Sequence, residues 1–220
     1  MEIAGRTGHP HTQVEAHAAE GSVSLERGDL ETAERVFERG LASSRSSVRD
    51  ANLLSGLGCI HALRGRHEEA LALLEESVSG GASISAMGSG LAVRLSRLAE
   101  ALLWAGRTAE APGHARAAVD LSIAHHERAN EAIARRVLAE ITASTDPSAA
   151  EEHYRQSLAL AVEIGMRPLV AHGHAGLGGL FRRLGKSREA GEHVDIALAA
   201  YREMGMRFWP ERVATGTYGA

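Results

Sequence analysis

The stretch LGCIHALRGRHEEALALLEESV, residues 57–78, decides the fold of this 220-residue chain. It contains a small residue, Gly58, then a turn signal at Gly65, then Ala70 twelve positions after Gly58. Apolar residues follow Ala70 at four and eight positions, beginning with Leu74, which is the spacing of one helix face. We therefore predict two antiparallel helices joined by a short turn, in which the glycine lets the alanine of the partner helix approach closely.

The same arrangement recurs along the chain at steps of 37, 41, 39 and 40 residues. The turn signals are RGDL at Gly28, RGRH at Gly65, AGRT at Gly106, STDP near Thr145 and LGKS at Gly185, and the alanines that follow them are Ala33, Ala70, Ala111, Ala150 and Ala190. One such helix pair cannot bury its apolar face alone. The sequence therefore predicts an all-α fold, a right-handed solenoid of about five stacked antiparallel helix pairs.

We expect a single helical repeat domain that spans residues 1–220. The predicted repeats are 11–44, 48–79, 90–125, 128–164 and 168–204, followed by a C-terminal cap at 205–220. Glycine and serine dominate the segment SGGASISAMGSG, residues 79–90, which predicts a flexible connector between the second and third pairs.

The composition argues against several classes of protein. The 24 basic and 28 acidic residues are interspersed and give a net charge of -4, so we expect no direct binding of nucleic acid. Cys59 is the single cysteine, which excludes an internal disulfide and a cysteine-based zinc site and suits a reducing compartment. No apolar run approaches the roughly 18 residues of a membrane span, so we expect a cytoplasmic protein without a membrane partner.

The repeat spacing resembles the tetratricopeptide repeat (TPR). The dipeptide LG at 57–58 and again at 177–178, the later alanine, and an aromatic residue at Phe37 or Tyr154 carry this resemblance. The resemblance implies a helical interaction scaffold, and its motifs specify an architecture but no ligand.

The C-terminal part of the chain contains an internal echo. AVEIGMRPLV at 161–170 is followed 40 residues later by YREMGMRFWP at 201–210. These long repeats are similar to the C-terminal TPR region of bacterial signalling ATPases linked to cyclases, and of LuxR-type and MalT-type regulators. That resemblance implies a role in signalling or transcription regulation in bacteria.

Two motifs that suggest cofactors do not have the required spacing. LFRRLGKS, which ends at Ser187, would be a nucleotide-binding P-loop only if glycine stood at Leu180. His172 and His174 are two residues apart, so on a helix they point away from each other and cannot share one metal ion. We expect no cofactor and no metal.

In a TPR-like stack the first helix of each pair lines the concave groove. By analogy with the family, we project onto that groove Asn52, Ser55, Val93, Glu100, Trp104, Arg135, His172, Arg182 and Arg183. Arg135, Arg182 and Arg183 would make its C-terminal half positive, which suits an acidic peptide or a terminal carboxylate. Phe208 and Trp209 follow the last pair, where they can cap the exposed apolar end or form a homodimer contact.

Three functions fit these observations. The first is a non-catalytic, regulatory protein-interaction scaffold that binds a peptide or partner domain in the groove. The second is a sensor whose groove binds a small effector, which an enclosed, apolar-walled pocket with a few polar groups would favour. The third is an enzyme on a repurposed helical stack, with His172, His174, Glu100 or Arg135 as its acid, base or anion holder; we expect no enzyme.

Overall fold

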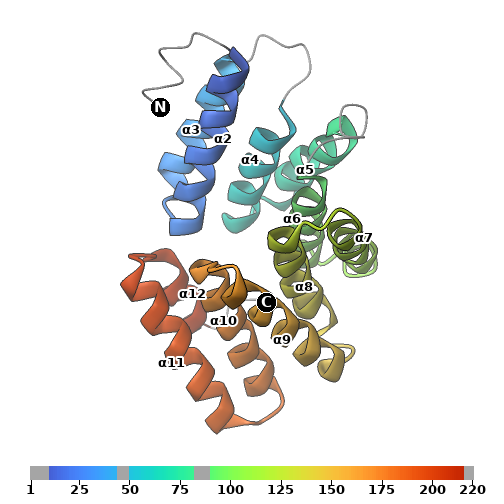
Figure 1. Ribbon diagram of the computed structural model, residues 1–220, viewed down its shortest axis with the longest axis vertical. Helices are drawn as coiled ribbons and strands as arrows, with labels where there is room; N and C mark the ends of the chain where they lie inside the picture. The colour runs from blue at the N-terminus through green and yellow to red at the C-terminus, as the bar shows by residue number, and fades with distance from the viewer. Residues whose placement is uncertain (1–9, 44–49, 82–89, 216–220) are drawn as a thin grey trace.

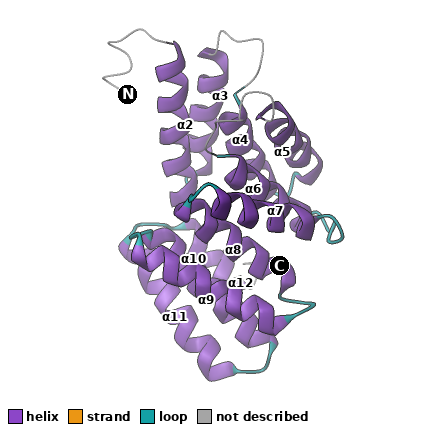
Figure 2. Ribbon diagram, turned by 45° about the vertical axis from the view of Figure 1, so that its right-hand side comes forward, coloured by secondary structure: helices purple, strands orange, loops and turns teal. Residues whose placement is uncertain are grey.

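The protein is helical throughout the part that the computed structural model describes, which is residues 10–43, 50–81 and 90–215. Eleven helices and no strands occupy these ranges (Figures 1 and 2). They are α2 (Pro10–Arg27), α3 (Leu30–Ser43), α4 (Ala51–Leu63), α5 (His67–Gly81), α6 (Leu91–Trp104), α7 (Ala111–Ala124), α8 (Arg128–Thr142), α9 (Pro147–Glu163), α10 (Arg167–Arg183), α11 (Ser187–Glu203) and α12 (Phe208–Thr215). The predicted all-α fold of five stacked helix pairs is confirmed.

The turns between paired helices form where the sequence places its glycines. Gly28 and Gly65 follow the first helix of their pairs with φ angles of 76° and 77°, in the left-handed region that side chains with a Cβ rarely adopt. Aspartates also cap the start of one helix in the second pair and one in the fourth pair. Asp50 accepts hydrogen bonds from the backbone N–H groups at the start of α4, and Asp146 does the same for α9.

The close approach of paired helices at small residues is confirmed. A Cβ added to Gly58 would lie 2.6 Å from Cγ of Leu74, and one added to Gly178 would lie 2.7 Å from Cγ2 of Val194. Both partners are the apolar residues that stand four positions after the repeat alanine. Glycine is therefore required at these crossings because any side chain would push the two helices apart.

The predicted connector at 79–90 is partly helical. Helix α5 continues through Gly81, and the hydroxyl of Ser79 donates to the backbone carbonyl of Glu75 at 2.9 Å, so this serine joins the helix. Residues 82–89 lie outside the described ranges.

The stack curves until its last helix meets its first (Figure 1). The indole Nε1 of Trp209 in α12 donates to the backbone carbonyl of Glu26 in α2 at 2.8 Å. A Cβ on Gly28 would lie 2.2 Å from Cβ of Phe208, so the start of α12 rests directly on the turn of the first pair. Phe208 and Trp209 therefore contact the first repeat of the same chain, and their role as a cap of the solenoid stays a prediction.

Candidate functional site

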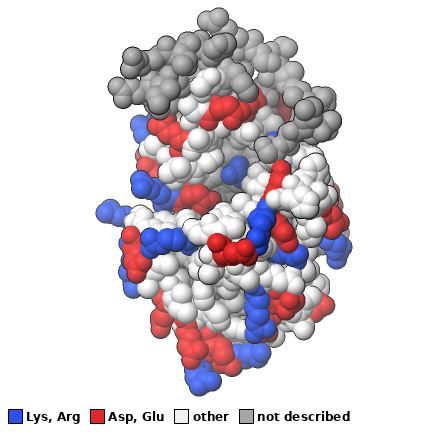
Figure 3. Space-filling model, viewed as in Figure 1, with Lys and Arg blue, Asp and Glu red and all other residues white. Residues whose placement is uncertain are grey.

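The concave side of the curved stack forms a partly open cavity of about 270 Å³. Its walls come from α2, α4, α6, α8 and α10, the first helices of the five pairs, and from α12. The lining residues are Leu25, Glu26, Cys59, Leu63, Val93, Ser96, Arg97, Glu100, Trp104, Ile133, Arg136, Val137, Glu140, Met166, Pro168, Leu169, His172 and Trp209. On the face shown in Figure 3, acidic and basic side chains lie next to each other around a depression near the centre.

Two carboxylates share one guanidinium in this cavity. Arg136 donates to Glu100 at 2.9 Å and, through its other terminal nitrogen, to Oε1 of Glu140. Glu140 is only 6% exposed, and its second oxygen, Oε2, has no hydrogen-bond partner. Burial raises the pKa of Glu140 to about 7; the charge of Arg136 opposes this shift and the Glu100 carboxylate adds to it. Arg136 thus serves two carboxylates, of which Glu140 is partly protonated at neutral pH.

A second group of charges lies between the first and last repeats. The Glu26 carboxylate is 3.8 Å from Nε2 of His172. Desolvation by the surrounding residues opposes ionisation of Glu26, although its side chain keeps 55% of its surface exposed; the interaction with His172 and the charges of Arg97 and Arg136 outweigh this effect and lower the pKa of Glu26. Arg97 itself donates to the Ser55 hydroxyl at 3.2 Å. Glu26 is thus a largely solvated, ionised carboxylate at the edge of the cavity.

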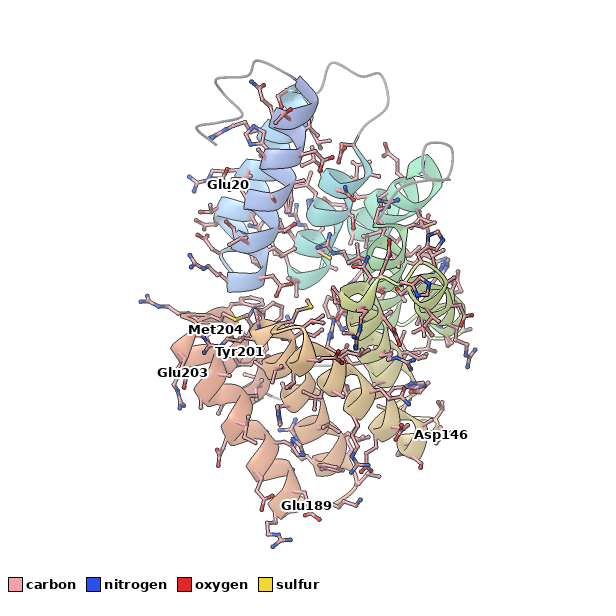
Figure 4. All side chains as sticks on the ribbon, in the orientation of Figure 1. Glu20, Asp146, Glu189, Tyr201, Glu203 and Met204 are labelled. Carbon is pink, nitrogen blue, oxygen red and sulfur yellow. The ribbon has the colours of Figure 1, made fainter. Side chains whose placement is uncertain are left out.

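Helix α12 closes one side of the cavity with aromatic contacts. The ring of Trp209 meets that of His172 edge-on, with 4.7 Å between centroids, and the guanidinium of Arg212 lies 5.6 Å from the ring centroid of Trp104. His172 is held from its other side by the hydroxyl of Tyr201, 2.8 Å from Nδ1. Figure 4 places Tyr201 at the C-terminal end of α11. One short helix therefore links α2, α6 and α10 across the ring.

Four of the residues projected onto the groove line the cavity: Val93, Glu100, Trp104 and His172. Ser55 and Asn52 are not among the lining residues; Ser55 accepts a hydrogen bond from Arg97, and Asn52 accepts one from Arg94.

The three arginines of the predicted acidic-partner surface do not line the cavity. Arg135 is paired with Glu131 at 2.7 Å, and Arg182 and Arg183 are exposed in the last turn of α10. An acidic partner for this surface stays a prediction, as does a homodimer through the C-terminal end.

The sequence reasoning missed the four charged groups that face Glu100, which are Glu26, Arg97, Arg136 and Glu140. For two of these groups the sequence did contain a signal. Arg97 and Arg136 are 39 residues apart, which is one repeat period, so they occupy the same position in adjacent first helices.

The two neighbouring histidines point apart, as their spacing predicts. His172 faces the cavity, whereas Nδ1 of His174 lies 2.8 Å from Nδ1 of His193. In the described ranges, no three side chains of His, Cys, Asp or Glu are placed to hold one metal ion. Cys59 lines the cavity, and burial raises the pKa of its thiol to about 11. None of the helices that the structure describes has the length and apolar character of a membrane span.

Comparison with known proteins agrees with this geometry. The sequence profile described as "Tetratricopeptide repeat" matches residues 18–85. Residues 18–85 thus match the tetratricopeptide repeat, and the later helix pairs continue the same arrangement. No curated protein matches the sequence of this chain.

Solved structures resemble the solenoid over most of its length. BtubC (BKLC) from P. vanneervenii is 19% identical with a TM-score of 0.61, and the match covers 92% of this chain and 87% of that one. A Rap protein complexed with Competence and Sporulation Factor is 13% identical with a TM-score of 0.74, over 96% of this chain and 58% of that one. A putative kinesin light chain from Podosopora anserina, with nearly identical TPR-like repeats, is 18% identical with a TM-score of 0.56, over 90% and 98%. These likenesses establish the fold.

Proposed function

We propose that this chain is a non-catalytic regulatory interaction module that binds a small effector in the cavity at the centre of its ring. The observation that carries the proposal is the contact of Trp209 with Glu26, because it brings α12 across the groove and adds a wall to the partly open cavity. A volume of about 270 Å³ lies close to the lower limit of small-molecule sites, and apolar walls with a few charged groups are typical of them. An extended peptide would need a longer and more open groove.

The fold supports a role in protein interaction. A TPR-like solenoid is the architecture of an interaction scaffold, and five second helices, from α3 to α11, remain on the outside of the ring for a partner. The Rap protein that shares this fold is complexed with Competence and Sporulation Factor, so that protein binds a factor. We infer for this chain that effector binding in the cavity and partner binding outside it are linked, as the resemblance to signalling regulators suggests.

The experiment is a ligand-observed NMR screen of a fragment library against three proteins. They are the natural chain, Val93→Trp, which fills the cavity from its wall, and Val162→Trp, which adds the same side chain at a position that is 65% exposed on α9. We expect ligands that bind the natural chain and Val162→Trp but not Val93→Trp. Binding that survives Val93→Trp would place the ligand elsewhere, and a library without cavity ligands would refute the effector proposal.

A further inference from the structure

We propose that the contact between His174 and His193 is a pH-sensitive link, which holds α10 on α11 at neutral pH and loosens when both imidazoles carry a positive charge. This inference goes beyond the proposed function, because it concerns the last helix pair and does not depend on any ligand in the cavity. It is carried by the geometry of the two imidazole rings.

The two rings meet between neighbouring helices. Helices α10 and α11 pack side by side (Figure 1), and Nδ1 of His174 lies 2.8 Å from Nδ1 of His193, which is a hydrogen-bond distance. The ring centroids are 4.9 Å apart, and both side chains are half-buried. Each imidazole is therefore the hydrogen-bond partner of the other across the helix pair.

This contact accommodates one additional proton but not two. In the neutral pair one Nδ1 carries a hydrogen and donates it, while the other Nδ1 accepts through its lone pair. A first additional proton can bind Nε2 of the donor ring, where it leaves the hydrogen bond intact. A second must take the lone pair of the accepting Nδ1, so that two N–H groups and two positive charges face each other at this distance. Double protonation therefore replaces a hydrogen bond by repulsion.

The surrounding charges offer little compensation for this repulsion. The charged groups that act on His193 are Glu192 on its own helix and Arg155 and Glu151 on α9. Glu151 is already paired with Arg155, and the side chain of Glu192 is 65% exposed, with Arg188 4.0 Å away. Both carboxylates are thus paired or largely solvated.

The apolar side of the link adds further positive charge. The ring of Phe181 lies 5.4 Å from that of His193, and Nζ of Lys186 lies 5.2 Å from the centroid of the same Phe181 ring. An aromatic ring on one side and an ammonium group beyond it do not favour a second imidazolium.

The link should therefore lose its stabilising effect in acid. Burial lowers the pKa of both histidines, and for His174 the positive charge of protonated His193 adds to this effect. The unfolded chain, in which an imidazole has a pKa of about 6.5, then binds more protons than the folded chain. The stability that the link contributes is present above about pH 6.5 and is lost as the pH falls below that value.

Loosening of this helix pair would reach the cavity. His172, which lines the cavity, precedes His174 by two residues in α10, and the hydroxyl of Tyr201 in α11 lies 2.8 Å from Nδ1 of His172. The same two helices thus carry the link and part of the cavity wall. Low pH should alter both together.

The test compares urea unfolding of the natural chain, His193→Gln and His125→Gln at pH 8 and pH 5. Glutamine at position 193 has no charge, and its amide can donate to a neutral His174 or accept from a protonated one. Between the two pH values we expect the equilibrium constant of unfolding to increase about tenfold more in the natural chain than in His193→Gln. His125→Gln is the matched control, because His125 is exposed in the turn after α7, and this variant should follow the natural chain.

Two further measurements keep the proposal testable if the variant folds poorly. Histidine NMR titration of the natural chain should show one imidazole of the pair that titrates clearly below about pH 6.5. Amide hydrogen exchange of the natural chain should show that α10 and α11 lose protection between pH 8 and pH 5 more than α3 and α4 do, after correction for intrinsic rates. An equal pH effect on the stability of the natural chain and His193→Gln, ordinary titration of both imidazoles, or unchanged relative protection of α10 and α11 would overturn the proposal.

Discussion

Substitution of Gly28 by alanine should separate α12 from α2 and so open the contact between the last and first repeats. Gly28 ends the first helix of the first pair with a φ angle of 76°, and a Cβ there would lie 2.2 Å from Cβ of Phe208. Because Cβ of Phe208 is fixed to its backbone, no rotation of the phenyl group relieves this overlap. Helix α12 must then move away from α2.

The magnitude has two parts. The left-handed conformation costs any residue other than glycine about 1 kcal/mol. Displacement of α12 adds the loss of the hydrogen bond from Trp209 to Glu26, about 1 kcal/mol, and of aromatic packing of Trp209 on His172, about another 1 kcal/mol. Gly28→Ala should therefore lower the free energy of unfolding by about 3 kcal/mol in all.

Gly65→Ala separates these parts, because Gly65 stands at the same position of the second repeat. Its φ angle is 77°, but an added Cβ would have nothing within 4 Å. It should lose only the conformational part, about 1 kcal/mol. The difference between the two variants, about 2 kcal/mol, measures closure of the ring.

Urea unfolding followed by far-UV circular dichroism gives both free energies, and amide hydrogen exchange reports whether α12 opens before the rest unfolds. We expect faster exchange in α12 for Gly28→Ala alone. Equal loss of stability in the two variants, with unchanged exchange in α12, would refute the contact between the first and last repeats.

Three further predictions follow from the described contacts. Gly58→Ala should destabilise the chain, because the added Cβ would lie 2.6 Å from Cγ of Leu74. Gly113→Ala should instead raise the free energy of unfolding by about 0.5–1 kcal/mol through helix propensity, because Gly113 lies in α7 and an added Cβ there would have nothing within 4 Å. Urea unfolding that gave both changes the same sign would contradict this pair of predictions. Cys59 of the folded chain should react with a disulfide reagent at pH 8 far more slowly than Cys59 of the urea-unfolded chain. The reason is that a thiol with a pKa of about 11 is only about one part in a thousand thiolate at that pH. Comparable rates would show that the pKa of Cys59 is not raised. The pKa of Glu140 is raised on folding, so the folded chain binds more protons than the unfolded chain between about pH 4.5 and 7, and the free energy of unfolding falls as the pH rises through that window. The stability of Glu140→Gln relative to the natural chain should therefore be higher at pH 8 than at pH 5. An equal difference at both pH values would disprove the raised pKa.

The fold could be predicted because its signals are local. The glycine and alanine of each repeat stand twelve positions apart, and the crossing of Gly58 with Leu74 shows why both residue types are needed. Closure of the ring has no such signal. Trp209 and Glu26 are separated by 183 residues, and their meeting depends on small rotations that accumulate over five pairs.

Part of the cavity lining could be predicted from the architecture. Glu100 and His172 line the cavity because the first helix of a repeat faces the groove, and their role in binding stays a prediction. Arg97 and Arg136 could have been found from their equivalent positions in adjacent repeats. Glu140 could not, because its burial depends on the neighbouring helix, which brings Glu100 to the shared guanidinium of Arg136.

The central claim, that the ligand sits inside the ring, can be measured directly with the natural chain. Its two tryptophans, Trp104 and Trp209, both line the cavity, so intrinsic fluorescence reports occupancy without any label. Titration with any cavity ligand from the fragment screen should change the fluorescence with the same dissociation constant as isothermal titration calorimetry and should protect it from acrylamide quenching. A ligand that binds in the calorimeter while the emission and quenching of both tryptophans stay unchanged would contradict the account.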